Sequence, residues 1–293
     1  MFRLYRFLSE LIMKFISFAI AVFLILLVIS FFLTKRIFRH SKKGFVKRLI
    51  VLILIHVLLT TVTTLVLMIP YYKAGETAHQ FLHSDEKTEL IDNERYYAFR
   101  NGSSKTAVIF YPGASVDEYA YSYLASSIAA DGVDVYVIKS PLHFPLLNGK
   151  GAASIFRETD YEKIFIGGHS LGGYVASRYA SNSNSEIDGL FLLGAYPFGK
   201  IDEQIRFLSI YGSEDGILDR KEYKERRQYW PEDSEEQVID GGNHSYFADY
   251  GLQRLDHEAL IDRKTQMELT HRLISEFILN PTPGFPTTQT VEQ

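Results

Sequence analysis

Two long apolar runs stand near the beginning of the chain. Residues 15–33 and 49–69 contain no charged side chain, and each matches the roughly 20 residues that a helix needs to cross the hydrocarbon core of a bilayer. The pattern predicts two transmembrane helices joined by a loop at 34–48. A cleaved signal peptide is the weaker interpretation of the first run, since charges precede it and no A-x-A-like site follows it. His56 in the second run is interpreted as a neutral, hydrogen-bonded side chain without a function of its own, with a proton relay as the alternative.

From residue 95 onward, short apolar runs alternate with amphipathic stretches. This alternation is typical of a mostly parallel sheet covered by helices on both faces. We therefore expect an α/β domain over residues 95–279, with residues 71–94 as a linker and the proline- and threonine-rich residues 280–293 as a disordered tail. Strands are predicted at residues 106–111, 133–139, 163–168, 188–194, 206–212 and 237–240, and helices at residues 118–130, 171–181, 220–229 and 259–279.

Charge is distributed unevenly along the chain. Residues 1–70 hold ten of the 31 Lys and Arg residues and one of the 35 Asp and Glu residues. Most of this positive charge lies in the loop 34–48, which the positive-inside bias places in the cytoplasm. Binding of anionic headgroups is the alternative explanation, and it gives the same side. We expect a multi-pass cell-membrane protein that contacts the lipid bilayer and has an extracytoplasmic domain.

The rest of the chain is acidic. Phosphate groups are repelled by such a surface, which argues against nucleic acid as a partner. The chain contains no cysteine, which excludes disulfides, cysteine nucleophiles and thiolate metal sites. It also lacks an H-E-x-x-H motif, a Walker loop and G-x-G-x-x-G, and therefore no metal or organic cofactor is implied.

A serine stands among four glycines in the stretch IGGHSLGGYVAS. Residues 168–172 spell G-x-S-x-G, which can mark a turn that exposes a nucleophilic serine between a strand and a helix. Ser170 follows the strand predicted at 163–168 and precedes a predicted helix, at the carboxyl edge where such sheets bind ligands. A serine that merely caps a helix at a glycine-rich turn is the alternative.

A serine nucleophile needs a base. His244 follows the strand predicted at 237–240, where a loop reaches the same edge of the sheet as Ser170. His143 follows an earlier strand and would line the mouth of the pocket. The remaining histidines of the domain are weaker candidates for the base: His169, His257 and His271.

The base in turn needs an acceptor that holds its tautomer. Asp215 follows the strand predicted at 206–212. Glu214 and Asp219 are rivals, although capping of the next helix suits Asp219 better. The order Ser170, Asp215, His244 is the order that α/β-hydrolases use.

Acyl transfer also requires N–H donors for an oxyanion. The backbone N–H of Leu171, directly after the serine, is one candidate. The N–H of Ala114, after Pro112 and Gly113 at the end of the first predicted strand, is the second. An ordinary Pro-Gly turn is the alternative at that position.

From about residue 105 to residue 278 the chain resembles the α/β-hydrolase superfamily, and within it α/β-hydrolase fold family 5. The resemblance implies an α/β-hydrolase fold with Ser170 as nucleophile, Asp215 as acid and His244 as base. It does not extend to the apolar runs, and no common substrate comes with it, because this fold supports many activities. The matching stretches are YPGASVDEYAY, VIKSPLHFPLL, IGGHSLGGYVASRYA, LLGAYP, SIYGSEDGI and GGNHSYFADYGLQ.

The connection after the strand predicted at 188–194 is too short for a large lid. A small partial cover could come from the segment VIKSPLHFPLLNGKGAASIF. We therefore expect a modest pocket that accepts small, accessible, uncharged esters in preference to long triglycerides. Aromatic side chains in nearby loops would form its rim: Tyr119, His143, Phe144 and Tyr196, with Tyr121.

These observations favour a membrane-anchored serine hydrolase of the carboxylesterase type, EC 3.1.1, which forms an acyl-enzyme on Ser170. An acyltransferase or thioesterase with the same triad is an alternative, because the acceptor alone distinguishes them. A non-catalytic scaffold with a hydrolase fold is the second alternative.

Overall fold

The computed structural model describes residues 22–39, 44–67, 71–85, 88–182 and 187–280. The chain divides into two compact units, Met1–Pro70 and Tyr71–Gln293.

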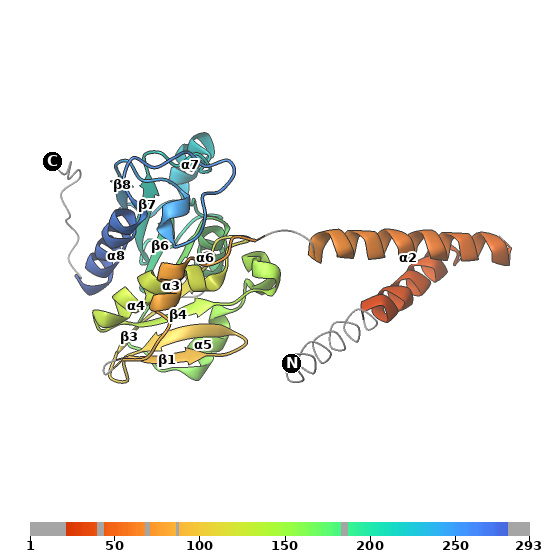
Figure 1. Ribbon diagram of the computed structural model, residues 1–293, viewed down its shortest axis with the longest axis horizontal. Coiled ribbons are helices and arrows are strands. Elements are labelled where there is room, and N and C mark those ends of the chain that lie inside the picture. Colours follow the sequence, from red (N-terminus) through yellow and green to blue (C-terminus); the bar gives the residue numbers. More distant parts are fainter. Residues whose placement is uncertain (1–21, 40–43, 68–70, 86–87, 183–186, 281–293) are drawn as a thin grey trace, which may run out of the picture. The chain divides into compact units, whose positions relative to one another are not determined.

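In the first unit, residues 22–37 are helical and α2 spans Phe45–Leu67 (Figure 1). The ring of Phe23 meets the ring of His56 on α2 edge-on, with 4.6 Å between centroids. Of the described residues, one helix is long and apolar enough to span a bilayer, over Phe45–Thr64 with a mean hydropathy of 2.2. The prediction of two spans is therefore not confirmed. Part of the first predicted span, residues 15–21, lies outside the described residues, as do residues 281–293 of the predicted tail.

In the second unit, the described residues form one eight-stranded sheet in the order β1-β2-β4-β3-β5-β6-β7-β8 (Figure 1). The first two strands pair antiparallel, and β2 pairs antiparallel with β4, whereas all the other pairs are parallel. The strands are β1 (Glu89–Asp92), β2 (Tyr96–Arg100), β3 (Thr106–Tyr111), β4 (Asp134–Ile138), β5 (Lys163–His169), β6 (Gly189–Leu193), β7 (Arg206–Gly212) and β8 (Glu235–Ile239).

Successive residues of a strand point to opposite faces of the sheet, and in this sheet helices bury both faces. In β3, Val108 and Phe110 join a core with α4 and α8, whereas Ile109 and Tyr111 join a second core with α5 and α6. The predicted α/β-hydrolase architecture, a mostly parallel sheet between helices, is confirmed. The helices are α3 (Glu76–Gln80), α4 (Ser122–Ala130), α5 (Ala152–Glu158), α6 (Leu171–Asn182), α7 (Arg220–Arg226) and α8 (Arg263–Leu279).

Short 3₁₀ helices complete the second unit. One of them precedes α4, where the sequence predicted a single helix from residue 118. The last helix was predicted from residue 259, but α8 begins at Arg263, because Asp262 caps it by accepting the N–H of Thr265. The 3₁₀ helices are η1 (Glu118–Tyr121), η2 (Pro141–His143), η3 (Pro145–Asn148), η4 (Arg227–Tyr229) and η5 (Ser245–Phe247).

The interpretation of residues 71–94 as a linker needs correction. Tyr72 donates its N–H to the carbonyl of Ser115 at 2.7 Å, Ala78 of α3 is fully buried, and β1 extends the sheet. The segment is part of the second unit. Its polar, acidic sequence concealed this, because β1 is a short edge strand whose two end residues are exposed.

Candidate active site

Ser170 lies on a sharp turn between β5 and α6. Its φ is 53°, a left-handed conformation that costs a non-glycine residue free energy and that recurs at functional sites. Its own N–H donates to the carbonyl of Leu193 at 2.9 Å, which ties the turn to the neighbouring strand β6. The side chain is partly exposed. This geometry is that of a nucleophile elbow.

The glycines of G-x-S-x-G allow the close approach of strand and helix at this turn. A Cβ on Gly168 would lie 2.5 Å from the carbonyl carbon of Gly172, and a Cβ on Gly172 would lie 2.1 Å from the carbonyl oxygen of Tyr111. Both distances are shorter than real Cβ contacts, and the atoms they would meet are backbone. The motif is therefore a steric requirement of the elbow.

Asp215 and His244 meet in the interior beside this turn. His244 Nδ1 lies 2.9 Å from Asp215 Oδ2, and both side chains are buried. The other oxygen of Asp215 accepts the N–H groups of Ile217 and Leu218 at 2.9 and 2.8 Å. Because an ionised carboxylate can only accept hydrogen bonds, a neutral imidazole in this contact has its proton on Nδ1 and a lone pair on Nε2.

The rival carboxylates have other partners. Glu214 accepts the hydroxyl of Ser213 at 3.0 Å, and Asp219 caps α7 by accepting the N–H groups of Lys221 and Glu222. The sequence offered three candidates for the acid, Asp215, Glu214 and Asp219, and the structure shows a different partner for each of them. Asp215 is the one that contacts His244.

Ser170 and His244 line the same cavity, of about 320 Å³. Nε2 of His244 is buried and has no hydrogen-bond partner among the described residues. A buried nitrogen without a partner costs free energy, and here it belongs to an imidazole that lines the same cavity as Ser170. The other residues lining the cavity are Leu171, Tyr174, Gly194, Ala195, Tyr196, Ile217, Leu218 and Asp219.

Asp256 connects the loops that carry the acid and the base. One of its oxygens accepts the N–H of Gly216 at 3.0 Å and the N–H of His244 at 3.3 Å. The other accepts both the N–H and the hydroxyl of Ser245 at 2.7 Å. Sequence reasoning missed Asp256, because it lies in an irregular loop and its partners are distant in the chain.

A second histidine packs against His244. His169 is fully buried, and its ring centroid lies 4.5 Å from that of His244. Burial lowers the pKa of His169 well below its ordinary value, and the neighbouring His244 lowers it further. The hydroxyl of Tyr121 accepts the N–H of Gly113 at 3.0 Å and lies 2.7 Å from His169 Nδ1, which joins the elbow to the loop after β3.

The two expected oxyanion donors are the backbone N–H groups of Ala114 and Leu171. On either side of Ala114, the N–H groups already have acceptors. Gly113 donates its N–H to Tyr121, and Ser115 donates its N–H to the carbonyl of His143 at 2.7 Å. Between them, the N–H of Ala114 has no acceptor in the described part of the chain. Leu171 is the first residue of α6, and the first N–H groups of a helix have no intrahelical acceptor.

The sequence profile of the alpha/beta hydrolase family matches residues 107–268, more than half of the chain. The chain belongs to this family. A search among curated proteins finds no match.

Solved structures of hydrolases are similar to this chain at low sequence identity. An esterase from Pyrococcus furiosus is 15% identical with a TM-score of 0.50, and the match covers 73% of this chain and 98% of that one. A monoacylglycerol lipase from Paleococcus ferrophilus is 18% identical with a TM-score of 0.48 over 65% of this chain and 98% of the other. Est1E from Butyrivibrio proteoclasticus is 15% identical with a TM-score of 0.46, covering 66% of this chain and 98% of its own.

Of the five residues expected to form the rim of the pocket, Tyr196 lines the cavity, and four are not among its lining residues: Tyr119, Tyr121, His143 and Phe144. The hydroxyl of Tyr119 contacts Asp92 at 2.7 Å, and its ring stacks on Tyr97. His143 is paired with Glu118. Phe144 is exposed to solvent. Tertiary contacts that the sequence does not show hold Tyr119 and His143 against other side chains, and the role of these residues at a substrate rim stays a prediction.

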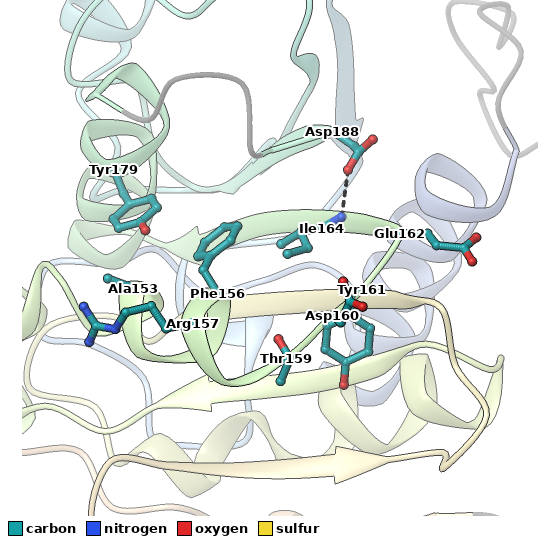
Figure 2. Close-up of a pocket in the computed structure, with 10 residues that line it drawn as sticks. All are labelled: Ala153, Phe156, Arg157, Thr159, Asp160, Tyr161, Glu162, Ile164, Tyr179 and Asp188. Carbon is teal, nitrogen blue, oxygen red and sulfur yellow. Dashed lines mark hydrogen bonds between the residues drawn. The ribbon is translucent and has the colours of Figure 1, made fainter.

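A larger cavity, of about 540 Å³, lies at the other end of β5 (Figure 2). It is lined by residues at the start of this strand, such as Glu162 and Ile164, and Asp188 accepts the N–H of Ile164 at its border. Its lining includes no serine, histidine or cysteine. Since β5 runs from this cavity to Ser170, the cavity and the candidate triad lie at opposite edges of the sheet.

Within the described residues, no group of three or more His, Asp or Glu side chains is placed to hold a metal ion. Besides His244, the polar side chains of Tyr174, Tyr196 and Asp219 line the cavity that contains Ser170.

Proposed function

We propose that this protein is a membrane-anchored serine hydrolase that cleaves carboxylic esters. One observation carries the proposal: a buried Asp215–His244 pair borders the cavity that contains Ser170 on its strained turn. Membership of the hydrolase family supports it, as does the shared fold with the Pyrococcus furiosus esterase.

In the proposed reaction, the Ser170 hydroxyl oxygen attacks the ester carbonyl carbon while its proton passes to His244 Nε2. The N–H groups of Leu171 and Ala114 stabilise the negative charge that develops on the carbonyl oxygen. The intermediate collapses, and the alcohol leaves with the proton from His244. Water, deprotonated by His244, then attacks the acyl-enzyme, which releases the acid and restores the serine.

The size of the cavity supports small substrates. At about 320 Å³, it is at the lower end of the range of small-molecule sites. Tyr174, Leu218 and Ile217 supply apolar surface beside the nucleophile. We propose uncharged esters with short acyl groups as substrates. Faster turnover of long-chain emulsions than of short soluble esters would contradict this part.

The anchor is proposed to be the first unit. The large apolar side chains of α2 are mostly exposed, for example Leu54 and Leu58, each 62% exposed, which suits a lipid environment. The basic segment 34–48 favours a cytoplasmic loop and an extracytoplasmic hydrolase domain. Protease added to intact cells should then digest the domain. Complete protection, with digestion after lysis, would contradict this orientation.

Labelling with a fluorophosphonate probe tests the catalytic proposal. The wild type should be labelled, and Ser170→Ala should lose the label because the nucleophile is absent. His244→Ala should lose most of it because the serine is no longer activated. Ser181→Ala is a matched control, since this serine lies on the same helix, further along the chain from Ser170, and is not among the residues that line the cavity. A folded wild type that resists the probe would refute the proposal.

A further inference from the structure

A set of large apolar side chains is exposed around the place where the chain enters the second unit. Each is between 37% and 57% exposed. All but one lie on η2 and η3 or between them. We call this set the apolar face: Tyr71, Leu142, Phe144, Leu146 and Leu147.

Hydrogen bonds fix the conformation of the segment that carries the apolar face. Glu118 accepts the N–H of Ser140 at 2.9 Å and pairs with His143 at 2.7 Å. Asn148 donates its side-chain N–H to the carbonyl of Lys139 at 2.8 Å. These hydrogen bonds hold the backbone of the segment in place, while its leucines are exposed to solvent. Exposed apolar patches on soluble domains mark interaction sites.

The charge of this segment differs from that of the rest of the unit. From Lys139 to Arg157 the chain contains no Asp or Glu, although the second unit as a whole is acidic. Lys150 in this segment and Lys73 beside Tyr71 are exposed. Apolar side chains flanked by lysines are the composition of surfaces that lie in the interfacial region of a membrane.

The covalent chain limits the distance between Tyr71 and the end of α2. Tyr71, the first residue of the second unit, stacks on His143 with ring centroids 4.2 Å apart. Four residue steps separate Tyr71 from Leu67, the last residue of α2. A chain of this length reaches at most about 14 Å. A bilayer that contains α2 therefore lies within reach of the apolar face.

We infer that the apolar face seats the hydrolase domain on the surface of the lipid bilayer, with Lys73 and Lys150 contacting anionic headgroups. The inference rests on the membrane anchoring proposed above. Docking would also affect the candidate active site. The segment with η2 and η3 follows the carboxyl end of β4. In it, the carbonyl of His143 accepts the N–H of Ser115, the residue after Ala114. Docking brings the loop with the proposed oxyanion donor to the membrane surface.

The absence of cysteine from the chain permits a direct test with a single label. The full-length Leu146→Cys variant is reconstituted in phosphatidylcholine–phosphatidylglycerol vesicles and labelled with an environment-sensitive dye. Leu279→Cys is the matched control, because Leu279 has a similar exposure, 48% against 42% for Leu146. It follows Phe277 and Ile278 at the end of α8, beside the start of β6, at the edge of the sheet opposite the candidate triad.

Docking predicts that lipids carrying a nitroxide near the headgroup quench most of the fluorescence at position 146 and little at position 279. Aqueous iodide should give the opposite order. Equal access of iodide to both positions would overturn the inference. So would a dye at position 146 that is shielded from iodide yet unquenched by nitroxide lipid, since a protein partner or a second copy would then cover the face.

Flotation of the same vesicles separates this inference from the proposal on which it rests. A chain that floats with the vesicles and has a water-exposed position 146 retains its anchor and refutes the docking alone. A chain that does not float refutes the anchor and the docking together. Fluorophosphonate labelling of both variants reports on the hydrolase proposal, since neither leucine lines the catalytic cavity.

Discussion

His244 Nδ1 lies 2.9 Å from Asp215 Oδ2, and the two side chains are 1% and 0% exposed. Burial strengthens this contact because little solvent screens it. The pair fixes the orientation of the imidazole at the border of the cavity that contains Ser170. A serine hydrolase requires this arrangement, since the base has to offer a lone pair to the serine and hold a positive charge afterwards.

Asp215→Asn tests the acid. An amide presents an N–H where the carboxylate accepted a hydrogen bond from Nδ1–H, which favours the wrong imidazole tautomer, and we expect kcat to fall by about 10³- to 10⁴-fold. Ester hydrolysis measures the change, and thermal unfolding checks that the fold persists. Glu214→Gln is the adjacent control, because Glu214 contacts Ser213 instead of the histidine. Equal losses in the two variants would exclude a specific role for Asp215.

Asp256→Asn tests the connection between the acid and base loops. The amide keeps one acceptor but loses the other, which loosens the contacts to Gly216 or to Ser245. Since small misplacements of catalytic groups are costly, we expect a loss of about 10²-fold in kcat with little change in KM. The exposed Asp240 provides a control through Asp240→Asn. A purely structural Asp256 would lower the melting temperature and leave kcat of the folded fraction intact.

Gly172→Ala tests the elbow. Its Cβ would meet the carbonyl oxygen of Tyr111 at 2.1 Å, and the backbone has to move to relieve the clash. We expect a decrease of about 1–3 kcal/mol in the free energy of unfolding, with loss of fluorophosphonate labelling. Gly199→Ala should be nearly neutral in denaturant unfolding, because nothing lies within 4 Å of its added Cβ. Wild-type stability of Gly172→Ala would contradict the steric argument.

The Glu118–His143 pair predicts a pH dependence of stability. The hydrogen bond to Glu118 raises the pKa of His143, partly opposed by burial, while the charges of Glu118 and Asp117 raise it further. A raised histidine pKa means that the stabilisation is complete below the ordinary value of about 6.5 and is lost as the pH rises through the folded-state pKa. Glu118→Gln should therefore lower the melting temperature more at about pH 5.5 than at about pH 9. A difference that is the same at both pH values would refute this linkage.

Much of the fold was predictable from local patterns. Alternating apolar and amphipathic runs predicted the central strands and most helices, because a strand buried on both faces leaves a continuous apolar run. The strands β1 and β2 and the short helix α5 were missed. Of the four residues of β1, two are exposed, so its sequence carries no such run, and its pairing with β2 supplies the stability.

The sequence by itself determined the elbow at Ser170 and the order in which Ser170, Asp215 and His244 follow their strands, because a strand–turn–helix junction is built from neighbouring residues. Tertiary structure alone decided that Asp215, and not Glu214, meets His244, and that Asp256 joins their loops. Those contacts depend on where β7 and β8 bring distant loops together, and their orientation within a few ångströms is set by packing across the sheet edge.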